Sequence, residues 1–170
     1  ASAYRVIRPA DLSKAAFAFL AIGDNATPIS ILHHLQSIQN DAGSWHRSYR
    51  INGEVVEPGL DLTQTAMPVI LAWRMKTLGL IGGSYYPMAR KAAAYIARVG
   101  PSSDTERWEE GMGFTPAELA AEISALVCAA NWAREMDENA AYSHLLSTAD
   151  YWQTKLEDWT FSECDCIGEG

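Results

Sequence analysis

The sequence predicts an all-α fold, and three observations support this prediction. Six segments repeat apolar residues at the three- and four-residue intervals that place side chains on one face of a helix. Helix start and stop signals separate these segments. No alternating run of apolar and polar residues is long enough to build a sheet. The helices pair at intervals of roughly forty to sixty residues, which favours helical hairpins arranged in a solenoid or a closed toroid.

The first two predicted helices are separated by Gly23. Asp11 is a favourable N-cap for the first helix, and Gly23 ends it. Thr27 and Pro28 supply an N-cap and a first-turn residue for the second helix. The apolar stripe of this second helix comprises Ile31, Leu32, Leu35 and Ile38.

Residues 41–59 interrupt the helical pattern. Within them, SYRI-NG-EVVE predicts a small β-hairpin closed by the two-residue turn Asn52–Gly53. A connection of about twenty residues is longer than two helices need, and such excursions are often functional. A surface hairpin without a function is the competing interpretation.

Four further helices follow this excursion. The third and fourth are expected at about 60–78 and 84–99, and a loop with several glycines at 100–113 follows them. The fifth helix has the clearest start, because Thr115–Glu118 is a capping box with proline in the first turn. The sixth is expected at about 138–159.

Composition limits the classes of partner. The chain has 170 residues, of which 48% are hydrophobic and 20% charged, as in a globular domain. Its formal net charge of −8 disfavours nucleic acid, and no apolar run is long enough to suggest a membrane partner. A neutral sugar would be insensitive to this charge. The N-terminus lacks a signal-peptide pattern, and the sequence leaves both secreted and cytoplasmic locations open.

The cysteines and histidines predict neither a metal nor a cofactor. Cys128 lies in an apolar helical stretch and is expected to be a buried thiol. Cys164 and Cys166 form a C-x-C pair, but no second cysteine or histidine pair supplies the remaining ligands. A disulfide from this pair to a segment outside the chain is the alternative. The four histidines show no metal-ligand spacing.

The segment Glu106–Glu110 is the strongest candidate for a catalytic segment. It places three carboxylates, an arginine and a tryptophan in a glycine-flanked loop that leads into a capped helix. Sugar hydrolysis needs this mixture, since an aromatic face packs on a pyranose ring and a carboxylic acid protonates the glycosidic oxygen. Trp45 and Trp108 fall in predicted loops and are the better candidates for stacking on a sugar. The alternative is a solvated acidic loop anchored by a tryptophan.

This region resembles a known family. The stretch GPSSDTERWEEGMGFTPAELAAEISALVCAANWA is similar to the general-acid region of bacterial glucoamylases and glucodextranases, glycoside hydrolase family 15. The resemblance extends to residues 4–24, to residues 39–73 with their ending P-x-x-LAWR, and to residues 147–160. It covers nearly the whole chain, and the RWEE block is its most specific part.

The resemblance implies a fold and an activity. The family fold is an (α/α)6 barrel, in which six inner helices are ringed by six outer ones, so the six helices of residues 1–170 would form about half of one catalytic domain. The implied activity is inverting, exo-acting removal of glucose from the non-reducing ends of α-glucans. Glu109 would be the general acid, and the implied substrate-binding residues are Asp11, Trp45, Arg107, Trp108 and Glu110.

The resemblance also implies a partner. An inverting glycosidase needs a second carboxylate as general base. In this family that glutamate lies much further along the sequence than Gly170. We therefore expect an oligosaccharide or α-glucan substrate and a complementary polypeptide that completes the barrel.

Four positions depart from the family pattern. Arg8 and Ala10 stand where the family reads W-P-R-D-L, Arg50 replaces a tryptophan near the hairpin turn, and Gln64 replaces a carboxylate. These losses would weaken glucose binding by several kcal/mol if nothing compensates. The alternatives are a shift toward an anionic sugar, a relative that binds without hydrolysing, or a shifted register at Arg8. A non-catalytic carbohydrate-binding or scaffolding helical protein is the competing class.

Overall fold

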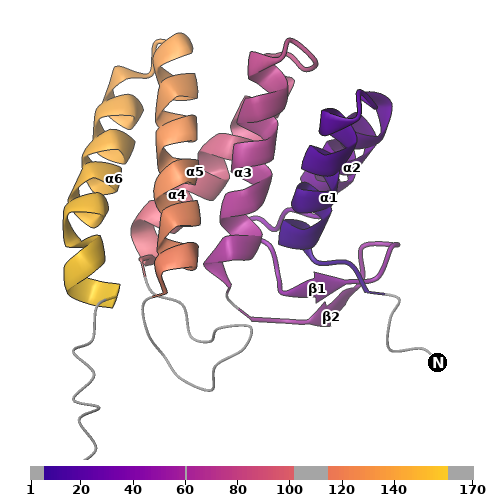
Figure 1. Ribbon diagram of the computed structural model, residues 1–170, viewed down its shortest axis with the longest axis horizontal. Coiled ribbons are helices and arrows are strands. Elements are labelled where there is room, and N and C mark those ends of the chain that lie inside the picture. Colours follow the sequence, from indigo (N-terminus) through magenta and orange to yellow (C-terminus); the bar gives the residue numbers. More distant parts are fainter. Residues whose placement is uncertain (1–5, 60, 102–114, 161–170) are drawn as a thin grey trace, which may run out of the picture.

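The computed structural model describes residues 6–59, 61–101 and 115–160. These residues form six α-helices, one short 3-10 turn at Gly83–Tyr85 and a two-stranded antiparallel ribbon (Figure 1). The predicted all-α class is confirmed. The helices are α1 Pro9–Ala21, α2 Ala26–Ser37, α3 Leu62–Thr77, α4 Tyr86–Val99, α5 Pro116–Glu135 and α6 Asn139–Thr160, and the strands are β1 Ser48–Tyr49 and β2 Val55–Glu57.

The helices form two layers. In one layer α3 packs between α1 and α5. In the other layer α2 packs on α1 and α3, α4 packs on α3 and α5, and α6 packs on α5 and α4. Consecutive helices run in opposite directions, so α1, α3 and α5 all begin at the lower end of the view in Figure 1. This alternation of inner and outer helices is the hairpin arrangement expected for part of an (α/α)6 toroid.

The core lies between the two layers, and α3 is its central element. Leu71 and Met75 of α3, Leu35 of α2, Ile96 of α4 and Leu126 of α5 are all fully buried. Helix α3 buries residues around much of its circumference, which is why its apolar pattern is less one-sided than that of α4. This packing gives the helix ends fixed positions.

Two helix starts differ from the predicted ones. Helix α1 begins at Pro9, which places Asp11 in its first turn instead of at the N-cap. Helix α2 begins at Ala26 after the N-cap residue Asn25, and the side chain of Asp24, one residue earlier, accepts hydrogen bonds from the backbone N–H groups of Ala26 and Thr27 at 3.0 and 3.1 Å. A carboxylate accepts two N–H groups better than the Thr27 hydroxyl accepts one, and this explains the earlier start. The predicted start of α5 is confirmed, because the Thr115 hydroxyl accepts from the N–H of Glu118.

The predicted hairpin is present, but its turn has three residues. The N–H of Gly53 donates to the carbonyl of Arg50 at 2.9 Å, and the N–H of Arg50 donates to the carbonyl of Glu54 at 2.8 Å. Gly53 has φ +90°, which makes the connection a turn followed by a left-handed glycine. Tyr49 also exchanges two backbone hydrogen bonds with Ile7, so the hairpin is attached to the chain that enters α1.

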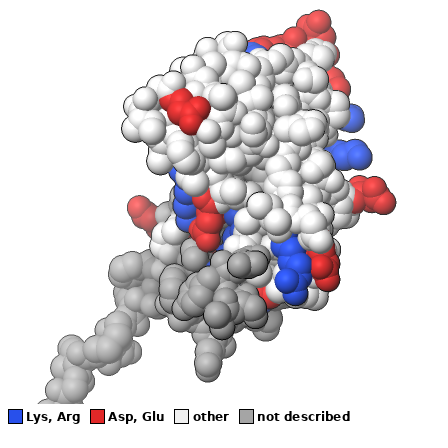
Figure 2. Space-filling view, turned by 90° about the vertical axis from the view of Figure 1, so that its right-hand side faces the viewer, with Lys and Arg blue, Asp and Glu red and all other residues white. Residues whose placement is uncertain are grey.

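The outer faces of α1 and α2 carry apolar side chains at one edge of the layers. Phe19 and Ile29 are each 36% exposed, and Ile22 is 77% exposed. Figure 2 shows this side of the molecule, and few charged side chains interrupt its upper part. None of the described helices is long and apolar enough to cross a membrane.

Candidate active site

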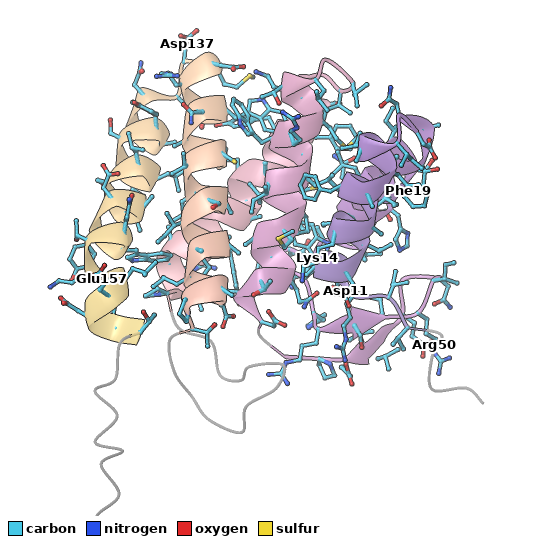
Figure 3. All side chains as sticks on the ribbon, in the orientation of Figure 1. Asp11, Lys14, Phe19, Arg50, Asp137 and Glu157 are labelled. Carbon is cyan, nitrogen blue, oxygen red and sulfur yellow. The ribbon has the colours of Figure 1, made fainter. Side chains whose placement is uncertain are left out.

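The candidate active site lies at the end where the inner helices α1, α3 and α5 begin. The connection 38–59 lies at this end, and α4 ends and α5 begins there, whereas the described connections at the opposite end are short. Figure 3 shows Asp11 of α1 and Arg50 of the hairpin at the first end and Asp137 at the opposite end. The N-termini of three helices also carry partial positive charge, which favours acidic side chains here.

A hydrogen-bonded bridge joins the first turns of α1 and α3. The side-chain oxygen of Gln64 accepts from the backbone N–H of Ala10 at 2.9 Å, and its amide nitrogen donates to Asp61 at 2.9 Å. Asp61 is the N-cap of α3 and also accepts from the backbone N–H of Gln64. Two of the four departures from the family pattern, Ala10 and Gln64, are therefore in direct contact, and both side chains are buried.

Asp11 lies next to this bridge in the first turn of α1 and is partly exposed. Its carboxylate is favourably placed at a helix N-terminus. This position at the site end is compatible with the substrate-binding role that the resemblance implies.

Helix α5 brings a buried carboxyl group to the same end. Glu122 is 0% exposed, and its two side-chain oxygens have no hydrogen-bond partner among the described residues. Burial, together with the nearby carboxylates of Glu118 and Asp61, raises the pKa of the Glu122 carboxyl to about 9. Sequence reasoning missed this residue, although a signal was present, since Glu122 lies three residues after Leu119 and four before Leu126 in the apolar stripe of α5.

Helix α4 ends at Gly100, which lies beside the carboxyl group of Glu122. A side-chain carbon built on Gly100 would lie 2.8 Å from Oε2 of Glu122 and 2.7 Å from the ring of Trp152 on α6. Only a residue without a side chain fits in this space. The start of the 100–115 connection is therefore held between α5 and α6.

The structure contradicts the predicted stacking role of Trp45. Its side chain is 1% exposed, and its indole N–H donates to the carbonyl of Leu35 at 2.8 Å. A ring packed in the core in this way offers no face to a sugar. Burying the large apolar ring of Trp45 while its N–H keeps a hydrogen-bond acceptor is more favourable than leaving the ring exposed in the loop.

Arg8 and Arg50 each form an ion pair with a carboxylate of the hairpin region. Arg8 lies 3.7 Å from Glu57, and Glu57 also accepts from the Ser48 hydroxyl at 2.9 Å. Arg50 lies 3.2 Å from Glu54. These pairs give both arginines a partner within the chain, so an anionic sugar is not needed to explain them.

The other predicted site residues, Arg107, Trp108, Glu109 and Glu110, lie outside the described residues, as do Cys164 and Cys166. The structure fixes the two ends of the connection that carries the first four, at Gly100 and at Thr115. Cys128 is partly buried, and burial raises the pKa of its thiol to about 11. Among residues 6–59, 61–101 and 115–160, no three histidine, cysteine or acidic side chains are grouped as metal ligands.

Comparisons with known proteins agree with this geometry. The profile of glycosyl hydrolases family 15 matches residues 35–167. A glucoamylase from Clostridium sp. (strain G0005) is 31% identical over 160 residues, which is 94% of this chain and 22% of that protein. The crystal structure of a bacterial glucoamylase complexed with acarbose superposes with a TM-score of 0.82 at 31% identity, covering 91% of this chain and 22% of that one.

The chain thus spans 22% of the length of the relatives that it matches. The family match covers most of its residues and includes the segment with the RWEE block. The helical layers superpose on a solved glucoamylase. On this evidence the chain is a glucoamylase-like region that belongs to glycoside hydrolase family 15.

Proposed function

We propose that this chain is part of the catalytic domain of an inverting glucoamylase-like hydrolase, with Glu109 as its general acid. The observation that carries the proposal is the anchoring of the 100–115 connection. Its start is packed against α5 and α6, and its end caps α5 at the same end where α1 and α3 begin. The family profile spans this whole connection. A proton donor on it would be held at the end of the inner helices.

In the proposed reaction, Glu109 donates a proton to the glycosidic oxygen as the bond from this oxygen to the anomeric carbon breaks. A water molecule, activated by a second carboxylate, attacks the opposite face of the sugar. The two carboxyl groups of inverting enzymes are about 6.5–9.5 Å apart. The second carboxylate would come from the part of the protein beyond this chain, and the substrate would be an α-glucan or oligosaccharide.

The proposed binding residues have separate roles. Trp108 supplies an aromatic face for the sugar ring, and Arg107, Glu110 and Asp11 hydrogen-bond its hydroxyl groups. Trp45 is excluded from this set because its ring is in the core.

The exposed edge of α1 and α2 supports a further part of the proposal, that residues 1–170 belong to one larger domain. Phe19, Ile22 and Ile29 lie on this edge, which Figure 2 shows to be sparsely charged. Exposed apolar surface of this kind marks an interface. The polypeptide that completes the toroid would cover it.

The test is hydrolysis of maltooligosaccharides by the natural protein and two variants. Glu109→Gln keeps the shape of the side chain but removes the acidic proton, and we expect kcat to fall by at least about 100-fold. Glu106→Gln, which removes another carboxylate of the same segment, should leave kcat within a few-fold of the natural value. Equal activity of the Glu109→Gln variant would exclude Glu109 as the acid.

A binding protein with impaired hydrolysis is the second candidate, and one observation favours it. The resemblance expects a sugar-contacting arginine at position 10, whereas the side chain of Ala10 is buried beside Gln64. Under this alternative the natural protein would bind maltooligosaccharides in calorimetric titration and release no glucose. Release of glucose at enzymatic rates would exclude the alternative.

A further inference from the structure

The first turn of α1 needs a hydrogen-bond acceptor from elsewhere in the protein. The first backbone N–H groups of a helix have no partner within that helix. In α1, Pro9 has no N–H, and the side chain of the N-cap residue Arg8 carries only donors, so it cannot accept from Ala10. Ala10 is 2% exposed, and a buried N–H without an acceptor would destabilise the fold.

Gln64 of α3 supplies this acceptor from 54 positions away in the sequence. Its Oε1 accepts from the N–H of Ala10 at 2.9 Å, and its Nε2 donates to Asp61 at 2.9 Å. A backbone N–H can only donate and a carboxylate accepts, so these two partners together fix which way the amide of Gln64 points. The buried side chain of Gln64 is therefore held in one orientation between the N-cap of α3 and the first turn of α1.

Asp11 follows Ala10 in the same turn, and its side chain is partly exposed at the candidate active site (Figure 3). Within α1, the hydroxyl of buried Ser13 donates to the carbonyl of Pro9 at 2.8 Å and strengthens this turn. The bond from Ala10 to Gln64 is different, because it is directional and joins the turn to another helix. It therefore links the backbone that carries Asp11 to α3.

We propose that Gln64 is a positioning residue for Asp11. By accepting from the N–H of Ala10, it holds the first turn of α1 against α3 and so places the Asp11 carboxylate for a sugar hydroxyl. The proposal rests on the proposed function for the contact between Asp11 and the sugar. It assigns Gln64 no contact with the substrate, because the amide is buried and both its oxygen and its nitrogen are bonded within the chain.

The first test compares hydrolysis of maltotriose by the natural protein and by Gln64→Met. Methionine has nearly the shape of glutamine, but it has no N–H donor and only a weak acceptor. We expect KM to rise at least about fivefold with kcat within about twofold, since a displaced binding group weakens the ground state and the transition state alike. Trp45→Phe, a core substitution away from this link, is the control and should keep the natural KM. A natural KM in Gln64→Met, or a loss confined to kcat, would overturn the proposal.

A double-mutant cycle with Asp11 separates positioning from a general loss of structure. Asp11→Ala should itself raise KM. If Gln64 acts through Asp11, adding Gln64→Met to Asp11→Ala should change KM by less than about twofold. Effects that multiply would show that Gln64 influences binding by another route, and the proposal would fail. A natural KM in Asp11→Ala would also overturn it, while leaving the role of Glu109 untouched.

Amide hydrogen exchange gives a measurement that does not depend on activity. Peptides covering residues 9–14 should exchange faster in Gln64→Met than in the natural protein, while exchange in α6 should not change. If the natural protein releases no glucose from maltotriose, the proposed function fails, and the exchange of 9–14 still decides whether Gln64 holds this turn. Unchanged exchange there would overturn the proposal. Should Gln64→Met not fold, Gln64→Ser carries the same expectations, because its short hydroxyl cannot replace the longer amide between α3 and Ala10.

Discussion

The side chain of Gln64 joins two inner helices by accepting a hydrogen bond from the backbone N–H of Ala10 at 2.9 Å. The same amide donates to Asp61, so it acts as acceptor and donor at once. A glutamate at position 64 would have no proton for Asp61 near neutral pH. Two of the four departures from the family pattern, Ala10 and Gln64, thus form one structural unit at the candidate active site.

This relationship predicts that Gln64→Glu destabilises the protein. The new carboxylate would face Asp61 in a buried position, and the loss of the donor leaves both acids without this hydrogen bond. We expect the free energy of unfolding to fall by about 1–3 kcal/mol. Urea unfolding measures this, and Gln153→Glu on the exposed surface of α6 is the matched control with little expected effect. Equal stability of the Gln64→Glu and natural proteins would contradict the bridge.

The buried carboxyl of Glu122 predicts a dependence of stability on pH. Its pKa rises from an ordinary value of 4.5 to about 9 on folding, so the folded state binds one more proton than the unfolded state between these values. The contribution of Glu122 to stability is therefore full below pH 4.5 and is lost as pH rises toward 9. The slope is at most about 1.4 kcal/mol per pH unit.

Urea unfolding at several pH values between 5 and about 8.5 measures this slope. The Glu122→Gln variant should be more stable than the natural protein near pH 8, and the difference should shrink toward pH 5. Asp61 and Glu118 are present in both proteins, so the difference reports on Glu122. Parallel pH profiles for the two proteins would show that Glu122 is not protonated in the folded state.

The burial of Trp45 predicts a stability effect without a binding effect. Trp45→Ala should lower the free energy of unfolding by about 3–5 kcal/mol because it leaves a cavity in the core. Trp45→Phe should cost less, since it retains most of the packing and loses the hydrogen bond to Leu35. Maltooligosaccharide titrations of folded Trp45→Phe should give the natural Kd. A large loss of affinity would restore the stacking role that the sequence predicted.

Two glycines allow the docking of the 38–61 connection to be tested. Gly43 has φ +98°, and a side-chain carbon there would lie 2.5 Å from the backbone oxygen of Lys91 on α4. Gly23 has φ +84° and nothing within 4 Å of such a carbon. Gly23→Ala should therefore show only the conformational cost of about 1–2 kcal/mol, and Gly43→Ala should cost more. Equal losses in thermal or urea unfolding would contradict close docking of this connection on α4.

Local sequence signals predicted the helices well. The capping box at Thr115 set the start of α5, and apolar stripes at helical spacing set all six helices. The failures came where several groups competed for one role. At the start of α2, the carboxylate of Asp24 accepts two backbone N–H groups, so the helix begins before Thr27. In the hairpin, Gly53 closes a three-residue turn instead of a two-residue one.

The candidate site was less predictable because its residues act across elements. The position of Trp45 in a predicted loop did not indicate that its ring packs in the core against α2. The contact between Gln64 and Ala10 joins residues 54 positions apart, which no local pattern encodes. The sequence shows Glu122 as an acidic residue within an apolar stripe, but its burial depends on the close packing of Gly100 and Trp152, which lie far from it in the sequence.

The most direct test of the central claim compares two leaving groups in the Glu109→Gln variant of the natural protein. Maltose needs a proton on its leaving oxygen, whereas the fluoride of α-glucosyl fluoride departs with little need for one. If Glu109 is the general acid, the variant will lose maltose hydrolysis while retaining much of its activity on α-glucosyl fluoride. An equal loss on both substrates, or no loss on maltose, would contradict this role for Glu109.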